Sequence, residues 1–322
     1  MSAPATMTMR DAFIGRLCDR MATDTSIFFL SADLGAPALD RIRFEFPDRF
    51  INVGIAEQNL INVASGLALE GFAVYTYAIA PFITMRAYEQ VRVNLAISSQ
   101  IRPVNVTMLG LGGGVSYQVS GPTHHCLEDL AIMRLLPNIS VYCPSDWVTA
   151  AALVDQTSTT TGPKYIRFDG KALPALQQCI DADDMKQGFR ELAKGSKVCI
   201  VSTGYMTHRA VSVATEIGGV GVIDLFRLKP FDRNRLMETI SSYKHIITIE
   251  EGFIGGGGLD SAIGALLTDV RSRITLDRIG FNDRYVFELG SRDHLHGLNG
   301  MGNASIAERV RNIIDDDGAN SG

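Results

Sequence analysis

The chain has 322 residues, 46% of them hydrophobic, which is enough for two domains of ordinary size, each with its own core. A formal charge of −5 with interspersed signs argues against nucleic acid as a partner, and five scattered cysteines without a Cys-x-x-Cys pair argue against a disulfide framework or a zinc site. No apolar run approaches the roughly 18 residues of a membrane span, and the N-terminus lacks a signal-sequence pattern, so we expect a cytoplasmic protein.

Strand-like runs alternate with helical patterns along the chain, which is typical of parallel α/β layers. The first block, residues 1–170, has candidate strands at 26–30, 50–53, 73–77, 104–109, 140–142 and 165–168. Residues 171–194 are charge-rich, with helical pieces and little strand character, and we interpret them as a surface linker. The second block, residues 195–322, repeats the rhythm with strands at 197–202, 220–224, 245–250 and 274–279. The prediction is an α/β protein of two consecutive doubly wound domains.

Glu57 stands at the junction between a predicted strand and a predicted helix. Residues 52–59 read Asn-Val-Gly-Ile-Ala-Glu-Gln-Asn and are followed by apolar residues at helical spacing. In the first turn of that helix, the dipole favours the ionised carboxylate by roughly 0.3–1 kcal/mol. The pattern alone leaves two interpretations open: a helix-capping glutamate without chemistry, or an anion aimed at a ligand beyond the strand.

Short motifs in both blocks carry a family resemblance. The first block contains Val-Gly-Ile-Ala-Glu-Gln at 53–58, Ser-Ala-Asp-Leu at 31–34, Arg-Ala-Tyr-Glu-Gln at 86–90 and Gly-Pro-Thr-His at 121–124. The second contains Val-Ser-Thr-Gly at 201–204 and Thr-Ile-Glu-Glu at 248–251. In order and spacing these motifs resemble the transketolase family, which depends on thiamine diphosphate. The resemblance implies a pyrimidine-binding domain followed by a transketolase C-terminal-like domain.

The resemblance also implies roles for particular residues. Glu57 is expected to hydrogen-bond the aminopyrimidine ring of the cofactor and activate it, and His124 is expected to face the substrate. Phe82 is expected to stack on the aminopyrimidine, with Tyr77 as the alternative aromatic residue. The remaining expected contacts are Asp33, Leu34 and Arg86 at the cofactor, and Arg10, Ser120 and His125 at the substrate.

One family motif is missing. Members that bind the diphosphate themselves carry Gly-Asp-Gly, followed about thirty residues later by an asparagine, to hold Mg²⁺. This chain has no Gly-Asp-Gly, so we expect no metal ligands in it and a second polypeptide that supplies the diphosphate-binding domain. The chain thus resembles the C-terminal half of a split transketolase, comparable to the beta subunit of 2-oxo acid dehydrogenase decarboxylases, in an α2β2 assembly.

Other departures concern the substrate. Matched to the family, its phosphate-gripping histidine and arginine fall on Gly112 and Gly170, and an acidic residue that contacts the sugar falls on Ser120. Only Arg10 keeps a phosphate-ligand position, with Arg167 and Lys171 close enough in sequence to substitute. Losing two charge-assisted contacts, of about 1.5–3 kcal/mol each, argues against a standard pentose phosphate.

Two further patterns have competing interpretations. The run Gly110-Leu-Gly-Gly-Gly114 lacks the lysine and helix of a phosphate-binding loop, so we interpret it as a flexible turn that allows close approach of substrate or a neighbouring subunit. The adjacent residues His124, His125 and Cys126 diverge too much in direction to chelate one metal ion easily.

The sequence therefore predicts the small (beta) subunit of a transketolase-like enzyme that transfers a two-carbon ketol unit from a ketose to an aldehyde, on a non-standard or non-phosphorylated sugar. One alternative is the beta subunit of a 2-oxo acid dehydrogenase decarboxylase component. Another is a non-catalytic scaffold or regulatory subunit that keeps the fold. Substituting Glu57 discriminates between catalysis and scaffolding, because a scaffold would not be affected.

Overall fold

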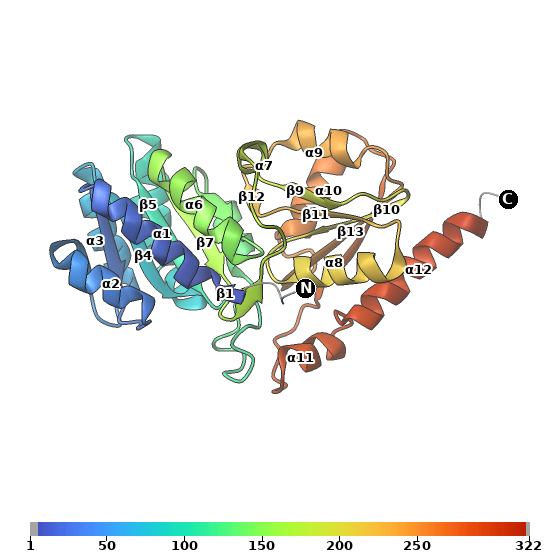
Figure 1. Cartoon of the computed structure of the whole chain (residues 1–322), viewed down its shortest axis with the longest axis horizontal. Coiled ribbons are helices and arrows are strands. Elements are labelled where there is room, and N and C mark those ends of the chain that lie inside the picture. Colours follow the sequence, from blue (N-terminus) through green and yellow to red (C-terminus); the bar gives the residue numbers. More distant parts are fainter. Residues whose placement is uncertain (1–5, 320–322) are drawn as a thin grey trace.

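The computed structural model describes residues 6–319, which form two α/β units side by side (Figure 1). The first unit is built on a seven-stranded sheet in the order β12-β6-β7-β5-β4-β2-β3, parallel except for β12. Its strands are β2 (Ile27–Ser31), β3 (Phe50–Asn52), β4 (Ala73–Ile79), β5 (Val106–Leu111), β6 (Ser140–Tyr142), β7 (Lys164–Phe168) and β12 (Arg227–Lys229).

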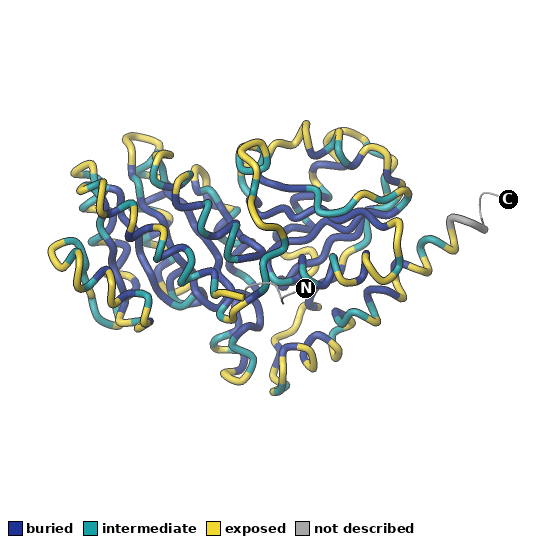
Figure 2. Tube along the Cα trace, viewed as in Figure 1, coloured by how far each residue is buried: buried dark blue, intermediate teal, exposed yellow. Residues whose placement is uncertain are grey.

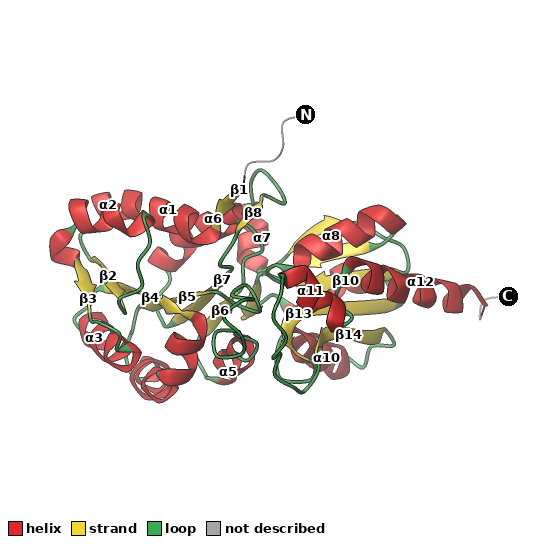
Figure 3. Ribbon diagram, turned by 90° about the horizontal axis from the view of Figure 1, so that it is seen from below, coloured by secondary structure: helices red, strands yellow, loops and turns green. Residues whose placement is uncertain are grey.

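Helices cover both faces of this sheet, as a doubly wound fold requires (Figure 3). One face carries α1 (Met9–Thr23), α2 (Ala38–Glu45) and α6 (Trp147–Thr159), and a short 3-10 turn (Pro47–Arg49) follows α2. The other face carries α3 (Glu57–Leu69), α5 (Asp129–Leu135) and an irregular helical segment made of Phe82–Arg86, α4 (Tyr88–Gln90), Val91–Ile97 and Ser98–Gln100.

The second unit has a five-stranded sheet in the order β14-β13-β10-β11-β9, parallel except for β9. Its strands are β9 (Arg190–Ala193), β10 (Val198–Ser202), β11 (Gly221–Asp224), β13 (His245–Phe253) and β14 (Thr275–Phe281). Its helices are α8 (Met206–Ile217), α9 (Arg233–Ile240), α10 (Leu259–Asp269), α11 (Arg292–Leu298) and α12 (Asn303–Ala319). Within the described part of the chain, no helix is both long and apolar enough to cross a membrane.

The segment 171–194 differs from the expected surface linker. It contains β8 (Ala172–Pro174), which pairs with β1 (Thr6–Thr8), the short helix α7 (Ala182–Gln187), and β9, which forms an edge of the second sheet. The two units also exchange structure, because β12 leaves the second block to pair antiparallel with β6 of the first sheet. A single buried cluster runs from Leu30 and Ala64 in the first unit to Cys199 and Leu225 in the second, and Figure 2 shows buried chain on both sides of the boundary.

Candidate active site

Glu57 is the first residue of α3, as the sequence pattern predicts. It shares the buried face of that helix with Leu60, Ile61, Ala64 and Ala68, so the helical spacing that packs these residues also buries the carboxylate. Glu57 is 3% exposed. The preceding residue, Ala56, provides no side-chain cap, so no side chain competes with the carboxylate for the positive end of the helix dipole.

Arg86 supplies a cation beside Glu57 from the irregular helical segment after β4. Its Nη1 donates to Oε2 of Glu57 at 2.7 Å, and the guanidinium lies over the ring of Phe82, 4.5 Å from the centroid. The edge of the His124 ring meets Phe82, with the centroids 5.4 Å apart. The structure thus gathers Glu57, Arg86, Phe82 and His124, four residues expected at the active site from different parts of the sequence.

Glu57 and Phe82 share one planar hydrogen-bond donor, the guanidinium of Arg86. The guanidinium of Arg86 is planar, donates to the buried carboxylate and stacks on the aromatic ring. An aminopyrimidine ring would make the same two kinds of contact. The side chain of Arg86 is 47% exposed, so it has solvent into which to move aside, whereas Glu57 stays fixed by its helix.

His124 lies in the Gly-Pro-Thr-His loop, with its main-chain nitrogen donating to Gly121 O at 3.0 Å. Its Nδ1 lies 3.0 Å from Thr123 Oγ1, and its Nε2 has no hydrogen bond within residues 6–319. The ring is half-buried, so Nε2 is the nitrogen left to meet a ligand.

His125, which was expected at the substrate, is a buried side chain. It is 4% exposed, and neither ring nitrogen has a hydrogen-bond partner among the described residues. Burial lowers its pKa, against the opposing influence of the Gln118 backbone and Glu251, so the neutral ring is favoured at neutral pH.

Asp33 and Leu34, both expected at the cofactor, lie on the turn after β2. Asp33 is exposed, with φ 57°, and is tied to Asn52 by two bonds, from its own main-chain nitrogen at 3.0 Å and to its carboxylate at 2.8 Å. The Oδ1 of Asn52 also accepts from Gly54 at 3.0 Å. Asp33 therefore shapes the segment that leads into Glu57, while the half-buried Leu34 packs against the core.

Arg10 and Ser120 belong to a separate group. The Nε of Arg10 donates to Asp11 Oδ1 at 2.7 Å, and its guanidinium lies close to the phenols of Tyr77 and Tyr117. Ser120 is exposed and donates its main-chain N–H to Tyr117 O at 2.9 Å. Tyr77 is fully buried among the residues of the α1 face, whereas Phe82 is only half-buried.

The glycine-rich run differs from the flexible turn we expected. Gly112 and Gly113 both donate to Phe168 O at 3.0 Å, which anchors the turn to the end of β7. A Cβ on Gly112 would overlap Tyr117, and one on Gly114 would overlap Glu251. We expected close approach of substrate or a neighbouring subunit at this run, whereas the structure shows side chains of the same chain against these glycines.

Arg167 is one of those side chains, and this rules it out as a substitute phosphate ligand. It is 5% exposed, it would overlap a Cβ on Gly113, and its Nη2 donates to Cys126 O at 2.8 Å and to Glu251 O at 3.0 Å. Its Nε lies 3.5 Å from Asp129 Oδ2.

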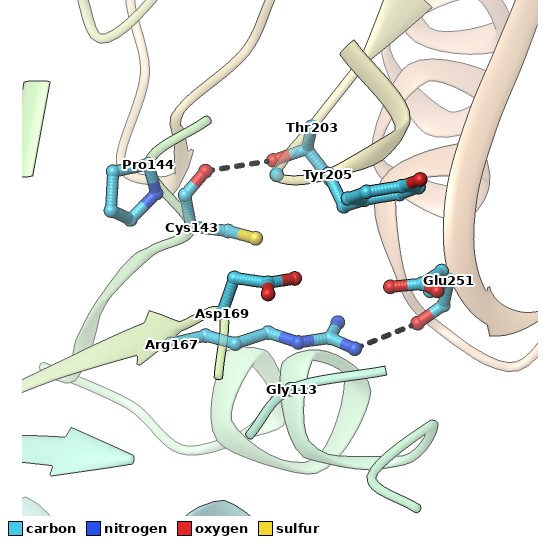
Figure 4. A pocket seen from close by; sticks show the side chains of 9 residues that line it. Gly113, Cys143, Pro144, Arg167, Asp169, Thr203, Tyr205 and Glu251 are labelled. Carbon is cyan, nitrogen blue, oxygen red and sulfur yellow. Dashed lines mark hydrogen bonds between the residues drawn. The ribbon is translucent and has the colours of Figure 1, made fainter. Parts of the chain in front are cut away.

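The boundary between the units is therefore held by buried charges (Figure 4). A cavity of about 10 Å³, room for about one water molecule, is lined from both sides by residues that include Arg167, Asp169, Tyr205 and Glu251. Arg292 of α11 donates to both carboxylate oxygens of Glu251 and lies 2.6 Å from Asp169. No local sequence pattern pointed to this cluster, because its members come together only in the fold.

Both units of the chain match known protein families. Residues 5–175 match the family described as transketolase, pyrimidine binding domain, and residues 189–306 match transketolase, C-terminal domain. Both matches define one class of protein, an enzyme that works with thiamine diphosphate. The chain belongs to the transketolase family.

Similar proteins include subunits of split transketolases. An apulose-4-phosphate transketolase subunit of Actinobacillus succinogenes is 34% identical over 268 residues, covering 82% of this chain and 84% of that protein. The 6-deoxy-6-sulfo-D-fructose transketolase subunit SqwH of a Clostridium species is 31% identical, covering 95% and 94%. A solved split gene transketolase, an inactive beta4 tetramer, is 30% identical with a TM-score of 0.82, covering 96% of this chain and 98% of that one.

Proposed function

We propose that this chain is the small (beta) subunit of a split transketolase that transfers a two-carbon ketol unit from a non-standard ketose to an aldehyde. The observation that carries the proposal is that the buried Glu57 carboxylate and the Phe82 ring contact the same planar donor, the guanidinium of Arg86. Thiamine diphosphate, when bound, supplies the carbon nucleophile and electron sink that split a ketose next to its carbonyl.

The residues of the chain would bind, orient and move protons. Glu57 would accept a hydrogen bond from the aminopyrimidine ring, in place of the one it accepts from Arg86, because burial makes an unpartnered carboxylate costly. Phe82 would provide the stacking face. His124 would present Nε2 to a substrate oxygen, where it can hold a proton or give one up near neutral pH. Asp33 would be a positioning residue, because it holds Asn52 and through it the turn before Glu57.

A second subunit completes the proposed enzyme. The names of the relatives support this, since two are transketolase subunits and the solved tetramer of beta chains is described as inactive. The partner would carry the Gly-Asp-Gly domain and hold the diphosphate and Mg²⁺, in an α2β2 assembly. The cofactor would then lie between unlike subunits, with Glu57 and Phe82 reaching it from this one.

The experiment is a calorimetric titration of thiamine diphosphate with Mg²⁺ into this chain, into a partner that carries Gly-Asp-Gly, and into their mixture. We expect binding in the mixture alone. Tight binding to the lone chain would contradict the shared site.

Glu57→Gln tests catalysis in the same complex. It should leave assembly intact and lower ketose turnover by a factor of about 10² or more, the range typical of proton-transfer groups. Glu70→Gln, on the exposed residue at the other end of α3, is the matched control. Full activity of Glu57→Gln would favour the scaffold alternative. Turnover of 2-oxo acids with a lipoyl acceptor, and of no ketose, would assign the decarboxylase alternative.

A further inference from the structure

Tyr117 lies between two glycines at the carboxyl ends of β5 and β7. One edge of its ring occupies the space that any side chain on Gly112 would need, and Gly112 has a φ of +87° that already disfavours other residues. A Cβ on Gly170 would lie 3.4 Å from Cε1 at the other edge and 3.3 Å from Ser116 Oγ. The ring thus fills the space at the carboxyl ends of β5 and β7, where the two strands could otherwise present larger side chains.

Hydroxyl groups without partners surround this ring. Ser116 and Tyr77 are both fully buried, and neither Ser116 Oγ nor Tyr77 Oη has a hydrogen-bond partner within the described residues. The hydroxyl of Tyr117 makes no hydrogen bond in that part of the chain either. Burial raises the pKa of Tyr77 to about 12, against a smaller opposing effect of the nearby Arg10, so its hydroxyl stays protonated. Tyr117 is half-buried, but Ser116 and Tyr77 are fully buried, and buried hydroxyls without partners are costly, which points to a ligand that supplies hydrogen-bond partners for these two.

The charges at this end cancel. Arg10 is paired with Asp11, Nε to Oδ1 at 2.7 Å, and Asp169 is paired with Arg292 at 2.6 Å. Arg167 is committed to main-chain carbonyls of the domain boundary. For an anionic group, the buried cations here are already paired with carboxylates. A hydroxyl group of a ligand would instead meet the hydroxyls of Ser116, Tyr77 and Tyr117 and one edge of the Arg10 guanidinium.

We propose that Tyr117 is a specificity-determining residue: with Ser116, Tyr77 and Arg10 it forms a charge-neutral subsite for the uncharged, hydroxylated end of the ketose. This inference rests on the proposed function and names its substrate class. The subsite excludes a phosphate- or sulfonate-terminated ketose through the volume of the Tyr117 ring and the absence of net positive charge. It differs in this respect from the phosphate and sulfo sugars in the names of the two relatives.

The test uses the assembled complex and a panel of ketopentoses and ketohexoses, each as the free sugar and as its terminal phosphate ester. The wild type should show its highest kcat/KM with a free ketose, and Tyr117→Phe should lower that value about 10-fold, mainly through KM, because one hydroxyl contact is lost. Tyr117→Ala should narrow the difference in kcat/KM between free and phosphorylated sugars, because removing the ring opens space for the phosphate group. Higher kcat/KM for the phosphate ester in the wild type would overturn the proposal.

Hydroxypyruvate separates this proposal from the proposed function. It delivers the same two-carbon unit after losing CO₂ and has no distal end to reach Tyr117. With a two-carbon aldehyde as acceptor, turnover of hydroxypyruvate should therefore fall less than ketose turnover in Tyr117→Phe, and it should be unchanged in Tyr243→Phe. The last is a control, since the Tyr243 hydroxyl accepts from Gly195 N–H beyond the far end of the second sheet. A wild type inactive on hydroxypyruvate would refute the proposed function itself, and an equal loss on hydroxypyruvate and ketose in Tyr117→Phe would refute the specificity role.

A binding measurement gives a readout that does not depend on turnover. Calorimetric titration of the complex with a five-carbon polyol and with its phosphate ester should show tighter binding of the free polyol. Tyr117→Phe should weaken that binding by a factor similar to the rise in KM. Unchanged polyol binding in Tyr117→Phe would overturn the proposal.

Discussion

Arg292→Met should destabilise the protein by about 3–5 kcal/mol, the cost of leaving buried carboxylates without their cation. Arg292 is 8% exposed, its Nε donates to Glu251 at 2.9 Å, and its guanidinium lies 2.6 Å from Asp169 and 3.6 Å from the centroid of the Tyr205 ring. After the substitution, Glu251 keeps His296 Nε2 at 2.7 Å as a partner. Asp169 keeps only a main-chain N–H. Methionine fills most of the volume of the Arg292 side chain, so the loss of stability reflects the missing charge rather than a cavity.

The dependence on pH distinguishes this cause from general damage. Burial alone would raise the pKa of Glu251, but Arg292 and His296 outweigh it and hold the pKa below the ordinary 4.5. In the wild type this stabilisation is present above about pH 4.5 and is lost as the pH falls further. In Arg292→Met, burial prevails and the pKa of Glu251 rises, so the variant loses stability as the pH rises from about 4.5 to the raised value. The difference between the two proteins should be largest near pH 7–8 and smaller near pH 5.

Urea unfolding followed by circular dichroism at pH 5, 6, 7 and 8 measures this difference. Arg284→Met is the matched control, because Arg284 pairs with Glu288 at the surface, where the two side chains are 49% and 38% exposed, and such pairs contribute about 0–1 kcal/mol. A loss under 1 kcal/mol for Arg292→Met, or one that does not change between pH 5 and pH 8, would refute the reasoning.

Three more outcomes follow from single sites. Burial lowers the pKa of Lys164 to about 7, so the free energy of unfolding should rise with pH between about 7 and the ordinary 10.5, and urea titrations should show that Lys164→Met removes this rise. Gly114→Ala should lower the melting temperature, because φ is +63° and the Cβ would overlap a buried carboxylate, while Gly66→Ala, in open space on α3, should raise the free energy of unfolding by about 0.5–1 kcal/mol. Phe82→Leu should weaken thiamine diphosphate binding to the complex by a factor of about 3–10 in calorimetry, whereas Phe44→Leu, at a side chain 86% exposed, should not change it.

Apolar periodicity predicted those helices and strands whose buried face is determined by the spacing of their own apolar residues. The strand before Glu57 and the helix after it follow from alternating and helical apolar spacing, and the carboxylate lies on the buried face because it continues that spacing. Arg227–Lys229 shows the opposite case. It has one apolar residue among three, and only the edge of a distant sheet makes it a strand.

Some residues of the candidate site were expected from the sequence, and others come together only in the fold. The pattern around Glu57 left its role open, and the expectation that Glu57, His124, Phe82 and Arg86 belong to one site came from the family resemblance. The sequence also indicated close approach at Gly112, because a glycine run permits it, but not that the Tyr117 ring would be the neighbour. The pairing of Arg292 with Glu251 and Asp169 spans long stretches of chain, and no spacing rule connects them.

The strand β12 makes the two units inseparable as laboratory fragments. A cut within residues 171–194 would remove the antiparallel neighbour of β6 and leave the N–H and C=O groups of that strand open at a sheet edge, a surface that promotes aggregation. In a chimera of two relatives, Arg227–Lys229 would have to come from the same protein as the first unit, because this strand completes the first sheet. Its position in the sequence, within the second block, would not be a guide. Engineering of this enzyme is therefore better done by substitution inside the intact chain than by recombining its halves.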